Sequence, residues 1–147
     1  FCRIDDREIR TREPVMRPDA LIVQDPTLLH QVSVFEGLSA QGYLLINSAH
    51  GFDRLGLGEF VAGLRRDRML VVPASRFAMT RLGRTVPNAA LLGGFAAISG
   101  VVSLVSVIAA IRERFTGAVA DGNAAAAHDA FEFVQAEMRE LADVATD

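Results

Sequence analysis

The sequence contains no lysine, because all 15 of its basic residues are arginine. This absence excludes mechanisms that need a lysine amine, such as Schiff-base chemistry and the lysine of a phosphate-binding loop. Tryptophan is also absent, and the formal net charge is −3. Because the balance is acidic and no basic stripe is interleaved with aromatic residues, the sequence argues against a nucleic-acid partner.

Cysteine and histidine are scarce, which limits metal and redox chemistry. Cys2 is the single cysteine, so the chain has neither an internal disulfide nor the ligands of an iron–sulfur cluster. His30, His50 and His128 are scattered, without the i, i+4 spacing of a helical metal site. We therefore expect no metal held by this chain. The scarcity of cysteine and a charged beginning without a signal peptide favour the cytoplasm.

Charge is missing from the stretch 86–111, although arginine and acidic residues are common on both sides of it. An apolar run of about 20 residues is long enough to span a bilayer. Here, however, glycines at 93–94 and the Ser-Gly pair at 99–100 interrupt the run, and Ser103 is placed to cap a new helix. We interpret the stretch as two helices packed inside a protein and expect no membrane association.

Three short apolar runs, at 20–23, 43–46 and 69–72, predict the strands of a sheet. They are continuously apolar, as in parallel strands that are buried on both faces, and helical segments separate them. With 147 residues, half of them hydrophobic, the chain fits one domain. We predict an α/β fold over 1–147: a Rossmann-like three-layer sandwich with a mostly parallel sheet and a helix-rich C-terminal part.

Capping residues and helix breakers predict where the helices begin and end. One helix is predicted from Pro26 to about Gly37. Its inward-facing residues are Leu28, Leu29, Val32 and Phe35. Further helices are predicted over 59–66, over 74–82 with Gly83 as the stop, on both sides of 99–100, and from Asn123 as N-cap to about 142.

Two short motifs suggest chemistry that their context does not support. Gly56 and Gly58 begin a G-x-G-x-x-G pattern, but Val61 stands in place of the third glycine and no strand immediately precedes the loop. Ser48 and His50 lie two positions apart, without the nucleophile elbow that exposes a catalytic serine. We predict no catalytic residue in this chain.

Residues 1–18 are charged, and their pattern predicts an extended arm. Pro18 disfavours a helical conformation at the residue before it. Two interpretations stay open, a solvated lead-in or an arm that pairs with a partner subunit. The chain begins at Phe1 rather than methionine, and we expect it to be the later part of something longer.

Two asparagines are the candidate binding residues. Asn47 follows a predicted strand, and ligands of open parallel sheets bind just outside the carboxyl ends of the strands. Asn88 opens the uncharged stretch's first helix, where free backbone N–H groups and the helix dipole favour an anion such as phosphate. The alternative for Asn47 is a turn residue, and for Asn88 it is a plain helix cap.

Four segments match one known family in the family's own order. They are CRIDDREIRTREPVMRPDALIVQDPTLL, EGLSAQGYLLINS, VVPASRFAMTRLGRTVPNAALLGGFAAISGVVSL and NAAAAHDAFEFV. Through them the chain resembles the gamma subunit, or gamma domain, of the 2-oxoacid:acceptor oxidoreductases of the pyruvate and ketoisovalerate type. In that family a strand and a glycine-rich turn precede the arm. Because this N-terminal third is not in the sequence, the resemblance implies a partial domain.

The resemblance implies a supporting role in a larger enzyme. These complexes oxidatively decarboxylate a 2-oxoacid such as pyruvate to acyl-CoA and CO2, and they pass electrons to ferredoxin or a similar acceptor. Thiamine diphosphate, Mg and 4Fe-4S clusters are held by partner subunits of the alpha, beta and delta types. The gamma part holds no cofactor alone and helps to position coenzyme A. Matching positions imply that Asn47 and Asn88 contact coenzyme A.

Two other hypotheses compete with this one. In the first, the chain is a purely structural module of such a complex, without ligand contact. In the second, it is a free-standing Rossmann-like enzyme. The lack of a phosphate-loop glycine pattern counts against the free-standing enzyme.

Overall fold

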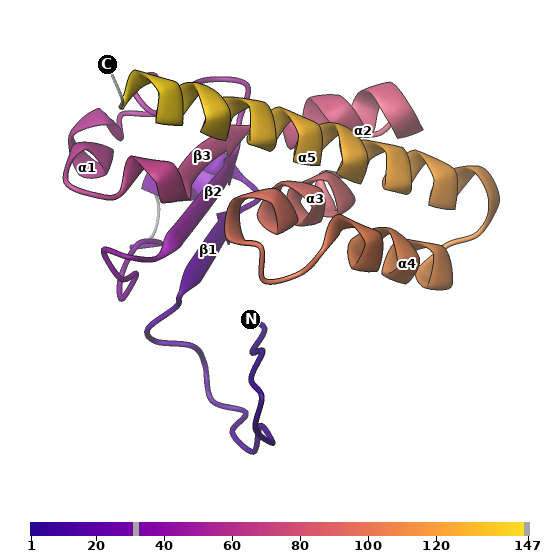
Figure 1. Ribbon diagram of the computed structural model, residues 1–147, viewed down its shortest axis with the longest axis horizontal. Helices are drawn as coiled ribbons and strands as arrows, with labels where there is room; N and C mark the ends of the chain where they lie inside the picture. Colours follow the sequence, from indigo (N-terminus) through magenta and orange to yellow (C-terminus); the bar gives the residue numbers. More distant parts are fainter. Residues whose placement is uncertain (31–32, 146–147) are drawn as a thin grey trace.

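A computed structural model describes residues 1–30 and 33–145. At its centre is a sheet of three parallel strands, shown in Figure 1. The strands lie in the order β1 (Ala20–Val23), β2 (Tyr43–Asn47) and β3 (Met69–Val72). The three strand predictions are confirmed, and Asn47 is the last residue of β2 rather than the residue that follows the strand.

The strands are apolar because both faces of the sheet are covered. Successive strand residues point to opposite faces. Leu44 and Ile46 therefore pack on one side, whereas Leu45 packs on the other side together with its register partner Leu70. All four side chains are at most 5% exposed. Burial on both faces explains why the strand sequences lack the alternation of half-exposed strands.

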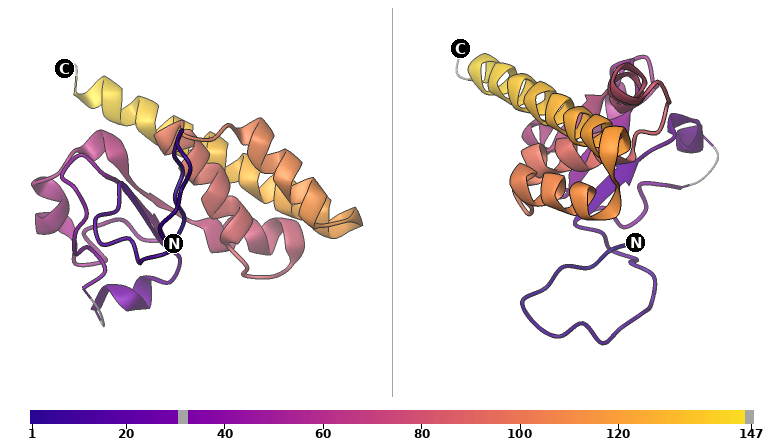
Figure 2. Two further views of the ribbon diagram at one scale, coloured as in Figure 1. Left: turned by 90° about the horizontal axis from the view of Figure 1, so that it is seen from below. Right: turned by 90° about the vertical axis from the view of Figure 1, so that its right-hand side faces the viewer.

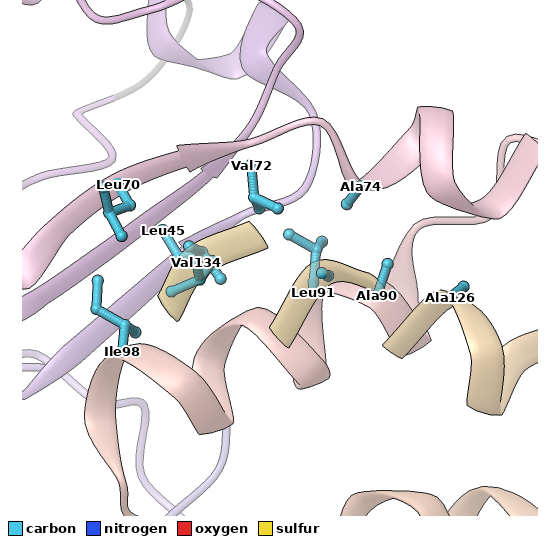
Figure 3. Close-up of a cluster of buried hydrophobic side chains, with 10 residues drawn as sticks. Leu45, Leu70, Val72, Ala74, Ala90, Leu91, Ile98, Ala126 and Val134 are labelled. Atoms are coloured by element: carbon cyan, nitrogen blue, oxygen red, sulfur yellow. The ribbon is translucent and has the colours of Figure 1, made fainter. Parts of the chain in front are cut away.

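Helices cover one side of the sheet, which we call the helical side. Its elements are α2 (Ala74–Leu82), α3 (Asn88–Ser99), α4 (Leu104–Arg114) and α5 (Gly117–Val144). Helices α3 and α5 lie against the strands, and α2 and α4 pack against these two helices. Figure 3 shows the shared core of the sheet, α3 and α5, with Leu45, Leu70, Leu91, Ile98 and Val134 among its members.

The predicted boundaries of α2, α3 and α4 are confirmed. Gly83 and Gly100 follow the first two of these helices with a φ of 66° each, a conformation that glycine adopts without strain. The Ser103 hydroxyl accepts a hydrogen bond of 3.0 Å from the Ser106 N–H at the start of α4. The uncharged stretch thus forms two helices, and no helix among the described residues is long and apolar enough to cross a membrane.

Small residues let α3 and α5 approach each other at backbone distance. A Cβ atom added to Gly93 of α3 would lie 2.0 Å from the carbonyl oxygen of Ala127 in α5. Ala124 and Ala127 are buried in the same cluster as Ala96 and Ile111. Gly93 and Gly94 therefore allow α5 to pack closely against the middle of α3, and they do not break the helix.

The predicted start of the last helix at Asn123 is wrong, because α5 already begins at Gly117. Asn123 lies inside the helix, where its side-chain amide donates a 2.9 Å hydrogen bond to the Val119 carbonyl one turn earlier. The preceding Gly122 packs against Leu82 of α2. Tertiary packing therefore overrides the local tendency of a Gly-Asn pair to begin a helix.

The opposite side, which we call the loop side, is covered mainly by the connections between the strands. Its short elements are η1 (Pro26–His30), α1 (Gly58–Ala62) and η2 (Arg66–Arg68). Its buried residues are Val23, Leu44, Ile46, Phe52, Leu57, Val61 and Met69. With the sheet between this layer and the helices, the predicted α/β three-layer fold is confirmed.

Two helix predictions on the loop side are wrong. The helix expected from Pro26 to Gly37 is only the 3-10 helix η1, and turns closed by the Glu36 and Leu38 N–H groups follow it at residues 33–38. Leu29 and Phe35 still pack inward, Leu28 is 41% exposed, and Val32 lies outside the described residues.

The helix expected over 59–66 is also shorter than predicted. It ends at Ala62, and a separate 3-10 turn follows over 66–68. Gly63 stands at the C-terminal end of α1, and Arg65 adopts an extended conformation in which its guanidinium pairs with Asp67. This local ion pair favours a turn over continuation of the helix.

Residues 1–18 contain no helix or strand, and they form an arm that leaves the body of the molecule and doubles back on itself, with a 3.4 Å hydrogen bond from the Arg3 guanidinium to the Pro14 carbonyl (Figures 1 and 2). Phe1, Ile4 and Met16 are each at least 65% exposed. The arm meets the body where its backbone passes Gly37, since a Cβ atom on that glycine would lie 2.0 Å from the Met16 carbonyl oxygen.

Candidate functional site

Asn47 is held by hydrogen bonds at the carboxyl end of β2. Its side-chain amide donates to the Gln24 carbonyl and to the Ser75 hydroxyl, both at 2.9 Å. Its side-chain oxygen accepts from the Ser75 backbone N–H at 3.1 Å. The residue is 7% exposed. Both amide protons of Asn47 are therefore used inside the chain.

These bonds join three elements that are distant in sequence. Gln24 follows β1, Asn47 ends β2, and Ser75 lies in the first turn of α2. The side chain of Asn47 thus fixes the carboxyl edge of the sheet to the helix that follows β3. Because Asn47 belongs to a strand, its interpretation as a turn residue does not hold.

Asn88 is the first residue of α3 and is exposed. The N-cap position belongs to Pro87, whose carbonyl accepts a 2.8 Å hydrogen bond from the Leu91 N–H. No side-chain capping bond forms at this helix start. The plain-cap interpretation of Asn88 is therefore wrong, and its amide is directed at no capping partner.

Both asparagines lie toward the carboxyl end of the sheet. In Figure 3 the first turn of α3, with Ala90 and Leu91, lies beside Val72 and Ala74, whereas Ile98 lies toward the other end of the strands. The start of α3 is thus at the strand ends, where parallel sheets bind their ligands. No hydrogen bond joins Asn47 to Asn88 in the part of the chain that the structure describes.

A cleft of about 470 Å³ opens beside Asn47. It lies between the loop 48–53, the region from η2 to β3, the start of α2 and the C-terminal half of α5. Its lining residues are Ser48, Ala49, His50, Gly51, Phe52, Asp53, Arg66, Leu70, Val71, Pro73, Arg76, Phe133, Glu137 and Leu141. Its volume lies within the range of about 300–1,000 Å³ that is usual for small-molecule sites.

Within the cleft, Ser48 and His50 form a turn rather than a catalytic pair. The Ser48 hydroxyl accepts a 2.9 Å hydrogen bond from the His50 backbone N–H. The described residues offer no group of three or more His, Cys, Asp or Glu side chains that is suited to a metal ion.

Two arginines of the cleft, Arg66 and Arg76, were not identified from the sequence. The Arg66 guanidinium lies 5.2 Å from the centre of the Phe52 ring, and that of Arg76 lies 5.7 Å from the centre of the Phe77 ring. Neighbouring Arg65 is engaged differently, because it donates to Asp67 and this hydrogen bond lowers the pKa of the Asp67 carboxyl. In the sequence, the only indication of a basic cluster here was the charged run Arg65-Arg66-Asp67-Arg68, which contains Arg66 but not Arg76.

The family of the chain follows from comparison with known proteins. A family described as pyruvate ferredoxin/flavodoxin oxidoreductase matches residues 1–133. The chain belongs to this family.

Relatives within the oxidoreductase family are of the gamma, or PorC, type. The pyruvate synthase subunit PorC of Methanothermobacter marburgensis is 38% identical over 132 residues, which are 90% of this chain and 69% of the relative. The common gamma subunit of the pyruvate/ketoisovalerate oxidoreductases of Pyrococcus abyssi is 35% identical over 137 residues, 92% of this chain and 71% of the relative. The resemblance drawn from the four sequence segments is confirmed.

A solved structure of the same type shares the fold. The crystal structure of the pyruvate oxidoreductase subunit PORC of Thermotoga maritima superposes with a TM-score of 0.68 at 30% identity, and the match covers 80% of this chain. It covers 64% of the Thermotoga chain, so the present chain spans about two thirds of the length of such relatives. The enzyme class, a subunit of the 2-oxoacid oxidoreductases, is thereby confirmed.

Proposed function

We propose that this chain acts as the gamma subunit of a complex that oxidatively decarboxylates a 2-oxoacid such as pyruvate to acyl-CoA and CO2. In this proposal the electrons pass to ferredoxin or a similar acceptor, and the complex works in the cytoplasm. The observation that carries the proposal is the family match over residues 1–133, together with relatives named as subunits of pyruvate synthase.

The redox and carbanion chemistry belongs to partner subunits of the alpha, beta and delta types. Thiamine diphosphate with Mg would form the reactive carbanion there, and 4Fe-4S clusters would carry the electrons. The composition supports this division of labour, because a chain with one cysteine and no lysine has few groups for covalent or cluster chemistry.

The part of this chain is to position coenzyme A, and Asn88 is suited to a direct contact. It is exposed, and it stands at a helix start where backbone N–H groups and the helix dipole favour a phosphate. A neutral amide also adds no charge next to a carbanion. Holding the thiol in an orientation suited to attack turns an encounter of two molecules into an oriented step, which is worth up to about 7–11 kcal/mol in favourable cases.

For Asn47, a coenzyme A contact stays a prediction. Its amide protons are donated to Gln24 and Ser75, so only its oxygen retains a free lone pair for a ligand. The geometry favours a positioning role, in which Asn47 holds the loop that begins at Ser48.

Co-purification is the direct test of the subunit assignment. The tagged chain is expected to bring down polypeptides that carry thiamine diphosphate and iron–sulfur clusters, and the recovered complex should form acyl-CoA from a 2-oxoacid. Recovery of this chain alone, in a form that is active without partners, would support the free-standing enzyme and overturn the proposal.

The contact of Asn88 is tested on the assembled complex. Asn88→Ala should raise the KM for coenzyme A about 3- to 10-fold, because one neutral hydrogen bond contributes roughly 0.5–1.5 kcal/mol. Gln135→Ala, which removes an exposed amide side chain from α5, is the matched control and should leave the KM unchanged. Equal KM values in Asn88→Ala, Asn47→Ala and the wild type would favour the purely structural subunit.

A further inference from the structure

The first turn of α2 is capped from a different element of the fold. Helix α2 follows β3 after the single residue Pro73, and this N-cap residue makes no side-chain hydrogen bond. The N–H groups of a first helical turn need acceptors from outside the helix. For the Ser75 N–H the acceptor is the side-chain oxygen of Asn47, at 3.1 Å. Asn47 of β2 therefore caps a helix that is distant from it in sequence.

The Ser75 hydroxyl bonds back to the same asparagine. It accepts a 2.9 Å hydrogen bond from the side-chain amide of Asn47, which also donates to the Gln24 carbonyl. In a capping box two residues of one helix start satisfy each other in this reciprocal way. Here the two residues belong to different elements. Because the oxygen and the nitrogen of the Asn47 amide are both bonded, only one orientation of that side chain fits.

These bonds are buried at the edge of the cleft. Asn47 is 7% exposed and Ser75 is half-buried. Asn123, the other buried polar residue in the described part of the chain, makes its side-chain hydrogen bond within its own helix. Beside Asn47, the Ser48 N–H donates a 3.1 Å hydrogen bond to the Val72 carbonyl. The loop that lines the cleft thus begins where β2, β3 and α2 are held together.

We propose that Ser75 is a positioning residue for the step that uses coenzyme A. The inference rests on the proposed function, in which the chain presents coenzyme A at this edge of the sheet. Ser75 acts through Asn47, and the pair holds the loop 48–53 against the start of α2 on the opposite wall of the cleft.

The hydroxyl is the part of Ser75 that this role requires. Any residue except proline at position 75 supplies the backbone N–H, whereas the acceptor comes from the serine side chain. Without it, one buried amide proton of Asn47 loses its partner, and the amide is no longer held in one orientation. Decarboxylation of the 2-oxoacid belongs to the partner subunits and should not depend on Ser75.

The experiment compares variants of the assembled oxidoreductase. Ser75→Ala should raise the KM for coenzyme A about 3- to 10-fold. The KM for the 2-oxoacid, and the release of CO2 in a single turnover without coenzyme A, should stay as in the wild type. Ser75→Thr keeps the hydroxyl and should stay within about 2-fold of the wild type. Ser106→Ala is the matched control, because it removes an exposed serine from the first turn of α4 whose hydroxyl bonds only to Ser103.

The double variant Asn47→Ala/Ser75→Ala tests whether Ser75 acts through Asn47. Its KM for coenzyme A should equal that of Asn47→Ala, because the hydroxyl then has no amide to orient. If the two single effects multiply instead, the inference is wrong. Loss of subunit assembly in Ser75→Ala, or a parallel rise in the KM for the 2-oxoacid, would overturn it in favour of a purely structural role.

A comparison with Asn88→Ala separates this inference from the proposed function. If Asn88→Ala raises the KM for coenzyme A and Ser75→Ala does not, the role of Ser75 is refuted and the proposed function stands. If neither variant changes this KM, the positioning of coenzyme A by this chain fails together with the role of Ser75.

Discussion

The two sides of the sheet differ in the size of their buried side chains. The helical side is largely alanine and glycine, with buried Ala74, Ala90, Ala126 and Ala130 and a backbone-distance crossing at Gly93. On the loop side the described buried residues are large, and none of them is alanine. Small side chains let helices pack so closely that a larger side chain would clash with the neighbouring backbone. Large side chains on short turns can instead move to accommodate a substitution.

The difference matters for the site because the cleft lies where the two sides meet. Its walls come from the loop 48–53 and η2 of the loop side and from α2 and α5 of the helical side. We therefore expect the wall from α2 and α5 to be rigid and the wall from the loop 48–53 and η2 to be adaptable. Asn47 holds the boundary between them through its hydrogen bonds to Gln24 and Ser75.

The strongest test of the comparison is Gly93→Ala on the helical side. The added Cβ would overlap the Ala127 carbonyl oxygen, so the variant should lose about 3 kcal/mol or more of unfolding free energy, despite the better helix propensity of alanine. Urea unfolding followed by circular dichroism measures the loss.

Gly63→Ala on the loop side is the matched control. The nearest atom to its added Cβ lies 4.0 Å away and its φ is −87°, so the change should stay within about 0.5 kcal/mol. If both variants were equally stable, the rigid character assigned to the helical side would be wrong.

A second, smaller effect is expected at the edge between the two sides. Asn47→Ala leaves the Ser75 N–H and the Gln24 carbonyl without their partner and should cost about 2 kcal/mol of unfolding free energy. Asn123→Ala removes an equally buried asparagine, but it loses one bond within α5 and gains helix propensity. Its unfolding free energy should change by less than about 0.5 kcal/mol, and a similar loss in both variants would contradict the linking role of Asn47.

The sequence predicted the helical side better than the loop side. Strands were found because their apolar runs are continuous, and α2, α3 and α4 because Gly83, Gly100 and Ser103 mark their ends through local backbone chemistry. The helix predicted from Pro26 was wrong because its inward residues pack through successive turns, a choice that depends on the sheet beneath them.

The site was predicted only in part for the same reason. Asn47 was found from its place at a strand end, but its partners Gln24 and Ser75 come from distant segments that only the fold brings together. Arg66 and Arg76 were missed because the cleft exists only where the far end of α5 lies over β3.

A third prediction compares two helix starts on the helical side. Ser103→Ala removes the acceptor of the Ser106 N–H and should lower the unfolding free energy by about 1 kcal/mol. Thr116→Ala is the control, since Thr116 stands at the start of α5 without a side-chain capping bond and should change it by less than about 0.5 kcal/mol. Thermal unfolding of both variants gives the comparison, and a larger loss in Thr116→Ala would show that packing rather than capping sets these boundaries.

The smallest expected effect is a dependence on pH that belongs to the loop side. The hydrogen bond from Arg65 lowers the pKa of the Asp67 carboxyl, so this pair stabilises the fold above the pKa of an unperturbed Asp, about 3.9. The stabilisation is lost as the pH falls through the lowered value. Asp67→Asn should therefore cost about 0.5 kcal/mol or less near neutral pH, because the pair is exposed, and nothing once the carboxyl is protonated. Urea unfolding from neutral to acid pH measures this difference, with Glu132→Gln on α5 as the control. If the difference in unfolding free energy between the wild type and Asp67→Asn instead grew as the pH fell, its sign would be wrong for an ion pair. The pH dependence would then come from a titratable group other than Asp67.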